Sequence, residues 1–138
     1  MSNNSNEAGD TAYLESFGLT IYLDKKQHIG TIVLMKIGII SDTHGYLDNG
    51  ILKHLKNCDE IWHAGDIGDL KIVASLENIA PVRAVYGNID GTSIRQHYPE
   101  NQIFEIAGKK IYITHIGGYP GKYQPAARKI IEQEKPDL

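Results

Sequence analysis

The stretch KIGIISDTHG, residues 36–45, decides the fold. Its apolar part, Ile37 to Ile40, is short and β-branched, which is typical of a strand buried in a parallel sheet. Asp42 and His44 follow directly, and Gly45 lets the chain turn sharply after them. Ligands of open α/β sheets bind beyond the carboxyl ends of the strands, so Asp42 and His44 are candidate site residues.

Strands and helices alternate on the carboxyl-terminal side of this stretch. The expected helices, recognised by apolar spacing and by Pro125 at a first turn, cover 47–55, 69–79 and 124–135. Further strands are expected at 59–64 and 82–86, followed after a loop to about Asn101 by two strands that turn tightly at Gly108. Residues 117–121 are expected to form a flexible loop. This order predicts an α/β fold with a mostly parallel sheet and an added hairpin.

The first 34 residues differ in character from the rest of the chain. They begin as a polar segment and leave room for one short strand around Leu19 to Leu23. Because the regular pattern begins at Met35, we expect Met35 to be the natural start and residues 1–34 to be an extension of uncertain structure, with the domain at 35–138. The competing interpretation is one longer strand, Thr31 to Ile40, against which the extension packs.

Composition excludes several classes of function. The chain has 138 residues, 41% hydrophobic and 22% charged, with a net charge of −3 and no run of Lys and Arg, so no nucleic-acid surface is expected. The single cysteine, Cys58, allows no internal disulfide. No segment reads as a membrane span or a secretory signal, and we expect a cytoplasmic protein that does not bind membranes.

Four polar clusters end four of the expected strands: Ser41–Gly45, Gly65–Asp66, Gly87–Asp90 and Thr114–His115. Taken singly, each cluster has an ordinary explanation. An Asp after a strand often caps the next helix, an Asn next to Gly is usually a turn residue, and a lone His at a strand end is more often structural than a ligand. Four such clusters at one sheet edge are a much stronger signal. Carboxylate and amide oxygens with imidazoles suit Mn²⁺, Fe or Zn²⁺.

The motifs DTHG (42–45), HAGDI (63–67), VYGNID (85–90) and THIGGYPGK (114–122) resemble those of the calcineurin-like metallophosphoesterases. Within that family the chain is similar to the small bacterial and archaeal phosphodiesterases, from Met35 to its end. The resemblance implies a layered α-β-β-α sandwich, here incomplete at its C-terminus, and hydrolysis of a small phosphodiester.

The resemblance also implies roles for individual residues. Asp42 and His44 would bind a first metal ion, Asp66 would bridge two ions, and Asn88 and His115 would bind the second. The ions would be divalent, foremost Mn²⁺, with Ni²⁺, Fe²⁺ or Zn²⁺ as alternatives, and a hydroxide between them would be the nucleophile. Catalysis would rest on Asp66, Asn88 and Asp90, the last by orienting a metal ligand. His63 is expected to be a buried structural residue.

The chain departs from the family pattern at two places. Ile89 stands where many members have a histidine that protonates the leaving group, which predicts a preference for aryloxide leaving groups. The family's Gly-His-x-His motif is absent, so we expect the chain to be a fragment of a longer protein. A sheet that lacks its last strands has an unpaired edge, and we expect this edge to favour association into a homo-oligomer. The alternative function is a non-catalytic scaffold or protein-interaction module on the same fold.

Overall fold

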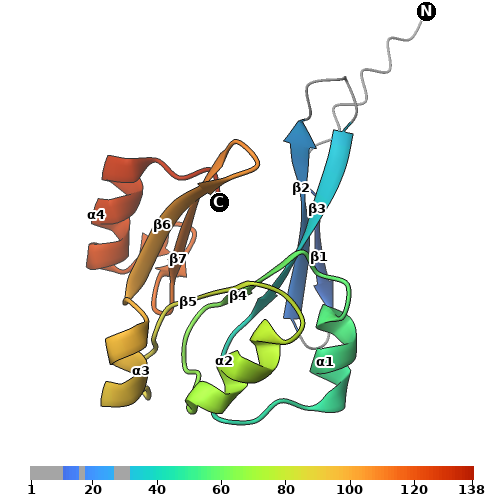
Figure 1. Ribbon diagram of the computed structural model, residues 1–138. Coiled ribbons are helices and arrows are strands. Elements are labelled where there is room, and N and C mark those ends of the chain that lie inside the picture. Colours follow the sequence, from blue (N-terminus) through green and yellow to red (C-terminus); the bar gives the residue numbers. More distant parts are fainter. Residues whose placement is uncertain (1–10, 16–17, 27–31) are drawn as a thin grey trace, which may run out of the picture.

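The larger sheet has five strands, which lie in the order of the chain (Figure 1). The computed structural model describes residues 11–15, 18–26 and 32–138. Within these, the strands are β1 (Thr11–Glu15), β2 (Gly18–Lys26), β3 (Ile32–Ile40), β4 (Glu60–His63) and β5 (Val82–Ala84). Strands β3, β4 and β5 are parallel as expected, whereas β1 and β2 are antiparallel additions, so the sheet is mixed and not mostly parallel.

The first strands come from the segment that the sequence leaves uncertain. β2 pairs with β3 from Leu19 opposite Ile39 to Lys26 opposite Ile32, so it is longer than the short strand expected there. β3 itself begins before Met35. The described part of residues 1–34 therefore forms strands of the sheet, and the position of the natural start stays a prediction.

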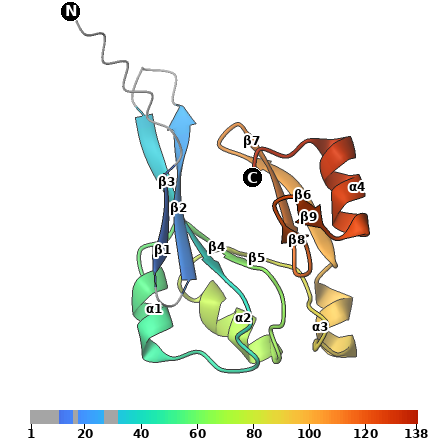
Figure 2. The ribbon, with the colours of Figure 1, turned by 180° about the vertical axis from the view of Figure 1, so that it is seen from behind.

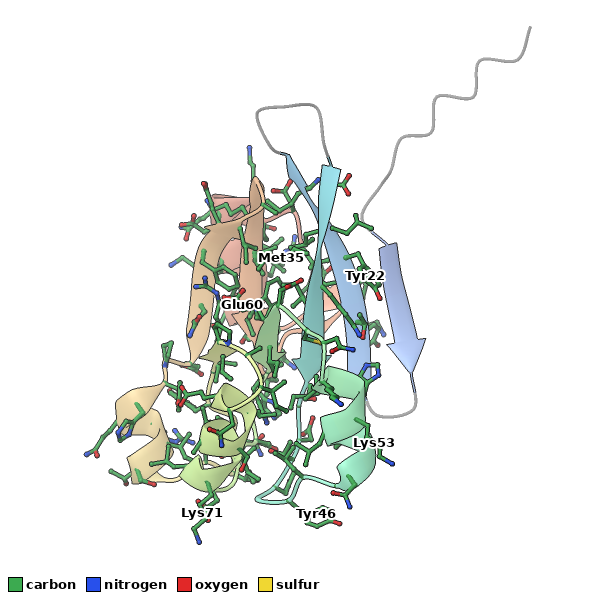
Figure 3. The ribbon with its side chains drawn as sticks, turned by 45° about the vertical axis from the view of Figure 1, so that its right-hand side comes forward. Tyr22, Met35, Tyr46, Lys53, Glu60 and Lys71 are labelled. Carbon is green, nitrogen blue, oxygen red and sulfur yellow. The ribbon has the colours of Figure 1, made fainter. Side chains whose placement is uncertain are left out.

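Two helices cover one face of this sheet: α1 (Asn49–Leu55) and α2 (Leu70–Glu77). The carboxylates of Asp48 and Asp69 cap them by accepting the backbone N–H groups of Ile51 and Lys71. Leu55 packs closely over β3 because position 38 is glycine, where a Cβ would collide with Leu55 and Cys58. Figure 3 shows Lys53 and Lys71 pointing from these helices into solvent.

A second sheet covers the opposite face (Figure 2). It is the hairpin of β6 (Asn101–Ile106) and β7 (Lys109–Thr114), whose two-residue turn places Ala107 and Gly108 at φ values of +52° and +74°. Residues of both sheets form the core between them: Ile21, Leu23, Ile37, Trp62, Val85, Ile111 and Ile113. The helix α4 (Pro125–Glu134) lies outside the second sheet, which confirms the layered α-β-β-α arrangement.

Two segments expected to be loops contain short regular elements. The helix α3 (Thr92–His97) lies before β6, and β8 (Gly118–Tyr119) pairs with β9 (Lys122–Tyr123). α3 has no side-chain cap and buries only Ile94, so its sequence carries little helical signal. Among the described residues, no helix has the length and apolar character needed to cross a bilayer.

Candidate metal centre

The polar clusters after β3 and β4 are held together by backbone hydrogen bonds. The N–H groups of Asp42, His44 and Gly45 donate to the carbonyl oxygens of Gly65, Asp66 and Ile67 at 2.9, 3.0 and 2.8 Å. This ladder continues the parallel pairing of the strands into the loops. It fixes the side chains of Asp42, His44 and Asp66 at one edge of the sheet.

Asp66 lies at the centre of the group of possible ligands. Its Oδ2 atom is 3.2 Å from His115 Nε2 and 3.6 Å from His44 Nε2. Asp42 Oδ1 is 3.8 Å from His44 Nε2 and 4.0 Å from His115 Nε2. One ligand atom from each of Asp42, Asp66 and His115 falls within 4.8 Å of the others, a spacing suited to coordinating one cation. Two carboxylates and two imidazoles therefore converge, and this donor set fits Mn²⁺, Fe or Zn²⁺.

The backbone at these residues is unusual. Asp42, His44 and Asp66 have φ values of +57°, +48° and +56°, in the left-handed region that residues other than glycine seldom occupy. Such conformations cost on the order of 1–3 kcal/mol each and cluster at functional sites. Their presence at three adjacent candidate ligands indicates that side-chain placement here overrides local backbone preference.

The histidine at the end of β7 presents a defined nitrogen to this group. Its Nδ1 atom lies 2.7 Å from the carbonyl oxygen of Ala64, which can only accept a hydrogen bond, so Nδ1 carries the proton. The Nε2 atom of His115 faces Asp66, and in the neutral ring with this tautomer its lone pair is available to a metal ion. A histidine that binds a metal through one nitrogen commonly donates its other N–H to a carbonyl in this way.

Asn88 lies in the next loop of the sheet, beside this cluster. The N–H of its neighbour Ile89 donates to Asp66 Oδ1 at 3.2 Å. Asn88 and His115 line the same cavity, and Asn88 is exposed. Gly87 lets this loop approach Asp66, because a Cβ at position 87 would overlap the Asp66 carboxylate.

The carboxylate of Asp90 binds backbone and not a side chain of the cluster. It accepts N–H groups from Gly87, Gly68 and Ile67 at 2.8, 2.8 and 3.1 Å. Burial raises the pKa of Asp90, but these three hydrogen bonds and the nearby His63 outweigh burial and leave the pKa below its ordinary value. Asp90 therefore ties the loop of Asp66 to the loop of Asn88, and it positions both.

His63 is fully buried under the cluster. Its Nδ1 atom accepts the Gly65 N–H at 3.2 Å, so Nε2 carries the proton and donates to Thr43 Oγ1 at 2.9 Å. The Thr43 hydroxyl in turn donates a hydrogen bond to the Ile67 carbonyl oxygen at 2.9 Å. Burial lowers the pKa of His63 to about 4. The residue is neutral and structural, as expected.

One residue beside the cluster carries no motif signal in the sequence. Arg95 of α3 donates from Nε to the Asp90 carbonyl at 2.6 Å and from Nη2 to the carbonyls of Gly87 and Asn88 at 3.4 Å each. Its guanidinium carbon also lies 4.5 Å from the centre of the Tyr86 ring. Arg95 reaches this loop because residues 92–97 form a helix, which the sequence pattern does not predict.

Comparison with known proteins identifies the family. The family model of the calcineurin-like phosphoesterase superfamily domain matches residues 35–137, so the chain belongs to this superfamily. The four motifs and the cluster around Asp66 lie within the matched region, whereas β1, β2 and the beginning of β3 precede it. The residue roles that the sequence resemblance implies for Asp42, His44, Asp66, Asn88, Asp90 and His115 stay predictions.

Archaeal proteins are among the similar curated sequences. A probable metallophosphoesterase of Methanocaldococcus jannaschii is 40% identical over 86 residues, covering 59% of this chain and 43% of that protein. One of Methanothermobacter thermautotrophicus is 34% identical over 95 residues, covering 62% of this chain and 52% of that protein. A phosphodiesterase of Methanocaldococcus jannaschii is 37% identical over 98 residues, covering 59% of this chain and 58% of that protein. The chain thus spans about half the length of these relatives.

Solved structures with the same fold include Vps29 proteins. A single mutant of Vps29 from Entamoeba histolytica superposes with a TM-score of 0.57 at 20% identity, covering 73% of this chain and 59% of that one. Vps29 of Chaetomium thermophilum superposes with a TM-score of 0.56 at 18% identity, covering 73% of this chain and 57% of that one. Similarity at this level of identity establishes the fold alone.

Proposed function

We propose that this chain carries most of the active site of a metal-dependent phosphodiesterase with a dinuclear metal site. The observation that supports the proposal is the position of Asp66, whose carboxylate lies between the imidazoles of His44 and His115. A carboxylate shared by two cations offsets their mutual repulsion, so a central Asp is what a two-metal site requires. The family and the name of the phosphodiesterase relative point to the same chemistry.

The residues of the chain divide the work at this site. In the division that the sequence resemblance implies, Asp42 and His44 would hold a first ion and Asn88 and His115 a second, and Asp66 would serve both. Asp42 Oδ1 also lies 4.0 Å from His115 Nε2, so the two ions would share one compact site. The two ions, which we propose to be Mn²⁺, supply Lewis-acid stabilisation of the phosphoryl oxygens and a bridging hydroxide as nucleophile. Ile89, 47% exposed beside Asn88, has no proton to donate to a leaving group. Esters whose leaving group departs as a stable anion, such as aryl phosphodiesters, are therefore the preferred substrates.

Metal titration and hydrolysis assays test this proposal. We expect the chain to bind Mn²⁺ at the cluster in calorimetry, and a chain extended to the length of its relatives to hydrolyse bis-(p-nitrophenyl) phosphate. Asp66→Asn should reduce Mn²⁺ affinity and turnover at least about 100-fold, since asparagine tolerates the positive φ but removes the shared charge. Glu105→Gln removes one charge from exposed β6 and should change neither quantity. Full turnover by Asp66→Asn would exclude the bridging role.

The second candidate is a protein-interaction module on the same fold. Solved structures of vacuolar protein sorting 29 share the fold, at identities that establish nothing beyond it. A scaffold does not require two carboxylates and two imidazoles around one point, nor three strained backbone positions to place them. The Mn²⁺ titration above separates the two candidates. A scaffold without a metal site should give the same calorimetric signal in the unsubstituted protein and in Asp66→Asn.

A further inference from the structure

A cavity opens beside the cluster on the side of Asn88 and His115. Its volume is about 160 Å³, and it is lined by Tyr86, Gly87, Asn88, Arg95, Glu100, Thr114, His115 and Ile116. Two of the proposed ligands thus form part of its lining. Other lining residues, among them Arg95 and Glu100, have no task in the proposed reaction.

The size of the cavity limits what it can hold. A cavity of about 150 Å³ accommodates one benzene ring, whereas pockets that enclose a whole drug-sized ligand measure about 300–1,000 Å³. The space beside His115 therefore suits a single ring attached to phosphorus, with the phosphoryl group at the cluster. Ile116, 55% exposed, supplies apolar surface next to the ligand His115.

Part of the cavity wall is polar and preorganised. Arg95 is held by three backbone carbonyls and lies over the ring of Tyr86, so its guanidinium loses little freedom on binding a ligand. The planar group has five N–H donors, and the bonds to Asp90, Gly87 and Asn88 involve Nε and Nη2 only. Donors remain at Nη1, and Glu100 adds an acceptor to the same wall. A ring with hydrogen-bonding groups at its edge matches this wall better than an alkyl chain does.

We propose that this cavity is the subsite for one organic substituent of the phosphoester, a single ring with hydrogen-bond acceptors at its edge, and that Arg95 is its specificity-determining residue. The proposal rests on the proposed function in one respect, because it places the phosphoryl group at the metal cluster. It goes further by naming which substituent the enzyme selects and which side chains select it.

Binding of stable phosphonates tests the subsite without turnover. Phenylphosphonate and methylphosphonate carry the same anionic group and differ only in the substituent, so the ratio of their affinities for the Mn²⁺-loaded protein isolates the cavity. Burial of one ring should favour phenylphosphonate about tenfold in calorimetry. Ile116→Trp fills the cavity and should reduce the ratio to about one, whereas Ile103→Trp, on the exposed side of β6, should leave it unchanged.

A second ratio tests Arg95. 4-Acetylphenylphosphonate adds an acceptor at the edge of the ring and should bind about fivefold tighter than phenylphosphonate, as expected for a hydrogen bond to a charged donor. In Arg95→Met this gain should disappear. Any general weakening caused by loss of the loop contacts affects both ligands equally and cancels in the ratio.

The outcomes separate this proposal from the function on which it rests. Equal affinities of phenylphosphonate and methylphosphonate overturn the subsite, even if Mn²⁺ binds as proposed. If Mn²⁺ does not bind, the metal-free protein is titrated with the same pair and followed by NMR. Shifts of the Gly87 and Ile116 amides that only phenylphosphonate causes then support the subsite while the proposed function fails, and their absence overturns both. A 4-acetyl gain that persists in Arg95→Met overturns the role of Arg95.

Discussion

Single residues at the cluster show a conflict between local backbone preference and side-chain placement. The left-handed conformations of Asp42, His44 and Asp66 are unfavourable for residues with a Cβ, and two of the three side chains are largely exposed, so packing does not compensate. The simplest explanation is selection for a site at a cost in stability, a pattern common in enzymes. This explanation can be tested at the most exposed of the three, Asp42.

Asp42→Gly should separate stability from metal binding. Glycine adopts a φ of +57° without strain, which offsets its larger loss of backbone entropy on folding, so the free energy of unfolding should stay the same or rise by up to about 1 kcal/mol. Mn²⁺ affinity should fall because a carboxylate is lost. Ser41→Gly, one position earlier, relieves no positive φ and removes the hydroxyl that donates to the Asp42 carboxylate, so it should instead lower the free energy of unfolding. Urea denaturation without metal measures both, and similar losses in the two variants would contradict the strain argument.

The buried His63 predicts how stability depends on pH. The residue titrates near 6.5 in the unfolded chain but at about 4 in the folded one, where Asp90, Asp42, Asp66 and His115 surround it and burial dominates. Below pH 6.5 the unfolded state therefore binds more protons, and stability falls as the pH falls from about 6.5 to about 4. The loss from this one group should amount to about 2–3 kcal/mol, because one pKa unit corresponds to about 1.4 kcal/mol.

Urea denaturation in chelator at pH 7 and pH 4.5 measures this loss. In His63→Gln the part of the pH dependence due to His63 should vanish, whatever the effect of the substitution on stability at pH 7. His97→Gln, which removes an exposed imidazole from α3, should retain it. Asp90 acts in a separate window, since its pKa lies below the ordinary carboxyl range and its contribution is lost only in stronger acid. An unchanged slope in His63→Gln would assign the acid sensitivity to other groups.

Residue identity and chain order were enough to predict which side chains gather at the cluster, but not how each one acts. Asp42, His44 and Asp66 follow expected parallel strands, which bring such positions to one edge of a sheet. His115 also follows an expected strand, but that strand is β7 of the second, antiparallel sheet, so the argument from parallel strands does not place it. The bonds of Asp90 to Gly87, Gly68 and Ile67 could not be predicted in this way. They depend on how closely two loops approach, a distance that no local pattern encodes.

At the scale of elements, a buried carboxylate orients side chains at the contact between the two sheets. Glu60 of β4 is 7% exposed and accepts the Trp62 indole N–H at 3.0 Å and the Arg83 Nε–H at 2.9 Å. Both donors contact the ring of Phe104 in the second sheet, Trp62 edge-on at 5.3 Å and Arg83 face-on at 4.1 Å. Glu60 thus orients the residues through which β4 and β5 meet β6.

Glu60→Ala should destabilise the protein by about 2 kcal/mol or more, since it leaves the buried indole N–H without a partner. The Arg83 side chain is 36% exposed, so solvent limits its share of the cost. Glu105→Ala, at an exposed position of β6, should change the free energy of unfolding by less than about 0.5 kcal/mol. Thermal and urea unfolding measure both variants. A loss below about 0.5 kcal/mol for Glu60→Ala would mean that Glu60 adds little to the contact between the sheets.

The predictability of each element follows from how much apolar surface it buries. Strand β4 is buried throughout and β3 buries Ile37, Gly38 and Ile40, and both follow from short apolar runs. Helix α2 has the expected helical spacing. The missed elements bury little: α3 buries Ile94 alone, and β8 and β9 are exposed. The pairing of β2 with β3 was also missed, because the alternation of Leu19, Ile21 and Leu23 indicates a strand but not its partner.

At the scale of the whole molecule, the cluster joins the two sheets. Asp42, His44 and Asp66 extend from the larger sheet, whereas His115 extends from the end of β7 in the second sheet and donates to Ala64 beyond β4. A cation held by His115 and Asp66 would therefore connect the two sheets at the edge where these two residues lie. Metal binding should accordingly stabilise the global fold and not only the loops.

Thermal unfolding with and without metal measures this connection. At a free Mn²⁺ concentration of 100 times the Kd, binding to the folded state alone adds about 2.7 kcal/mol, which for a domain of this size corresponds to a rise in Tm of about 10 °C. His115→Ala removes the ligand from the second sheet and should abolish most of the rise, whereas His97→Ala removes an imidazole from α3 and should keep it. If His115→Ala keeps the full rise, the cation is held by the larger sheet alone. In that case the two layers of the described structure are joined without the metal, by their shared core, by the contact of Arg83 with Phe104 and by the Gln102 side chain, which donates to the Ala84 carbonyl.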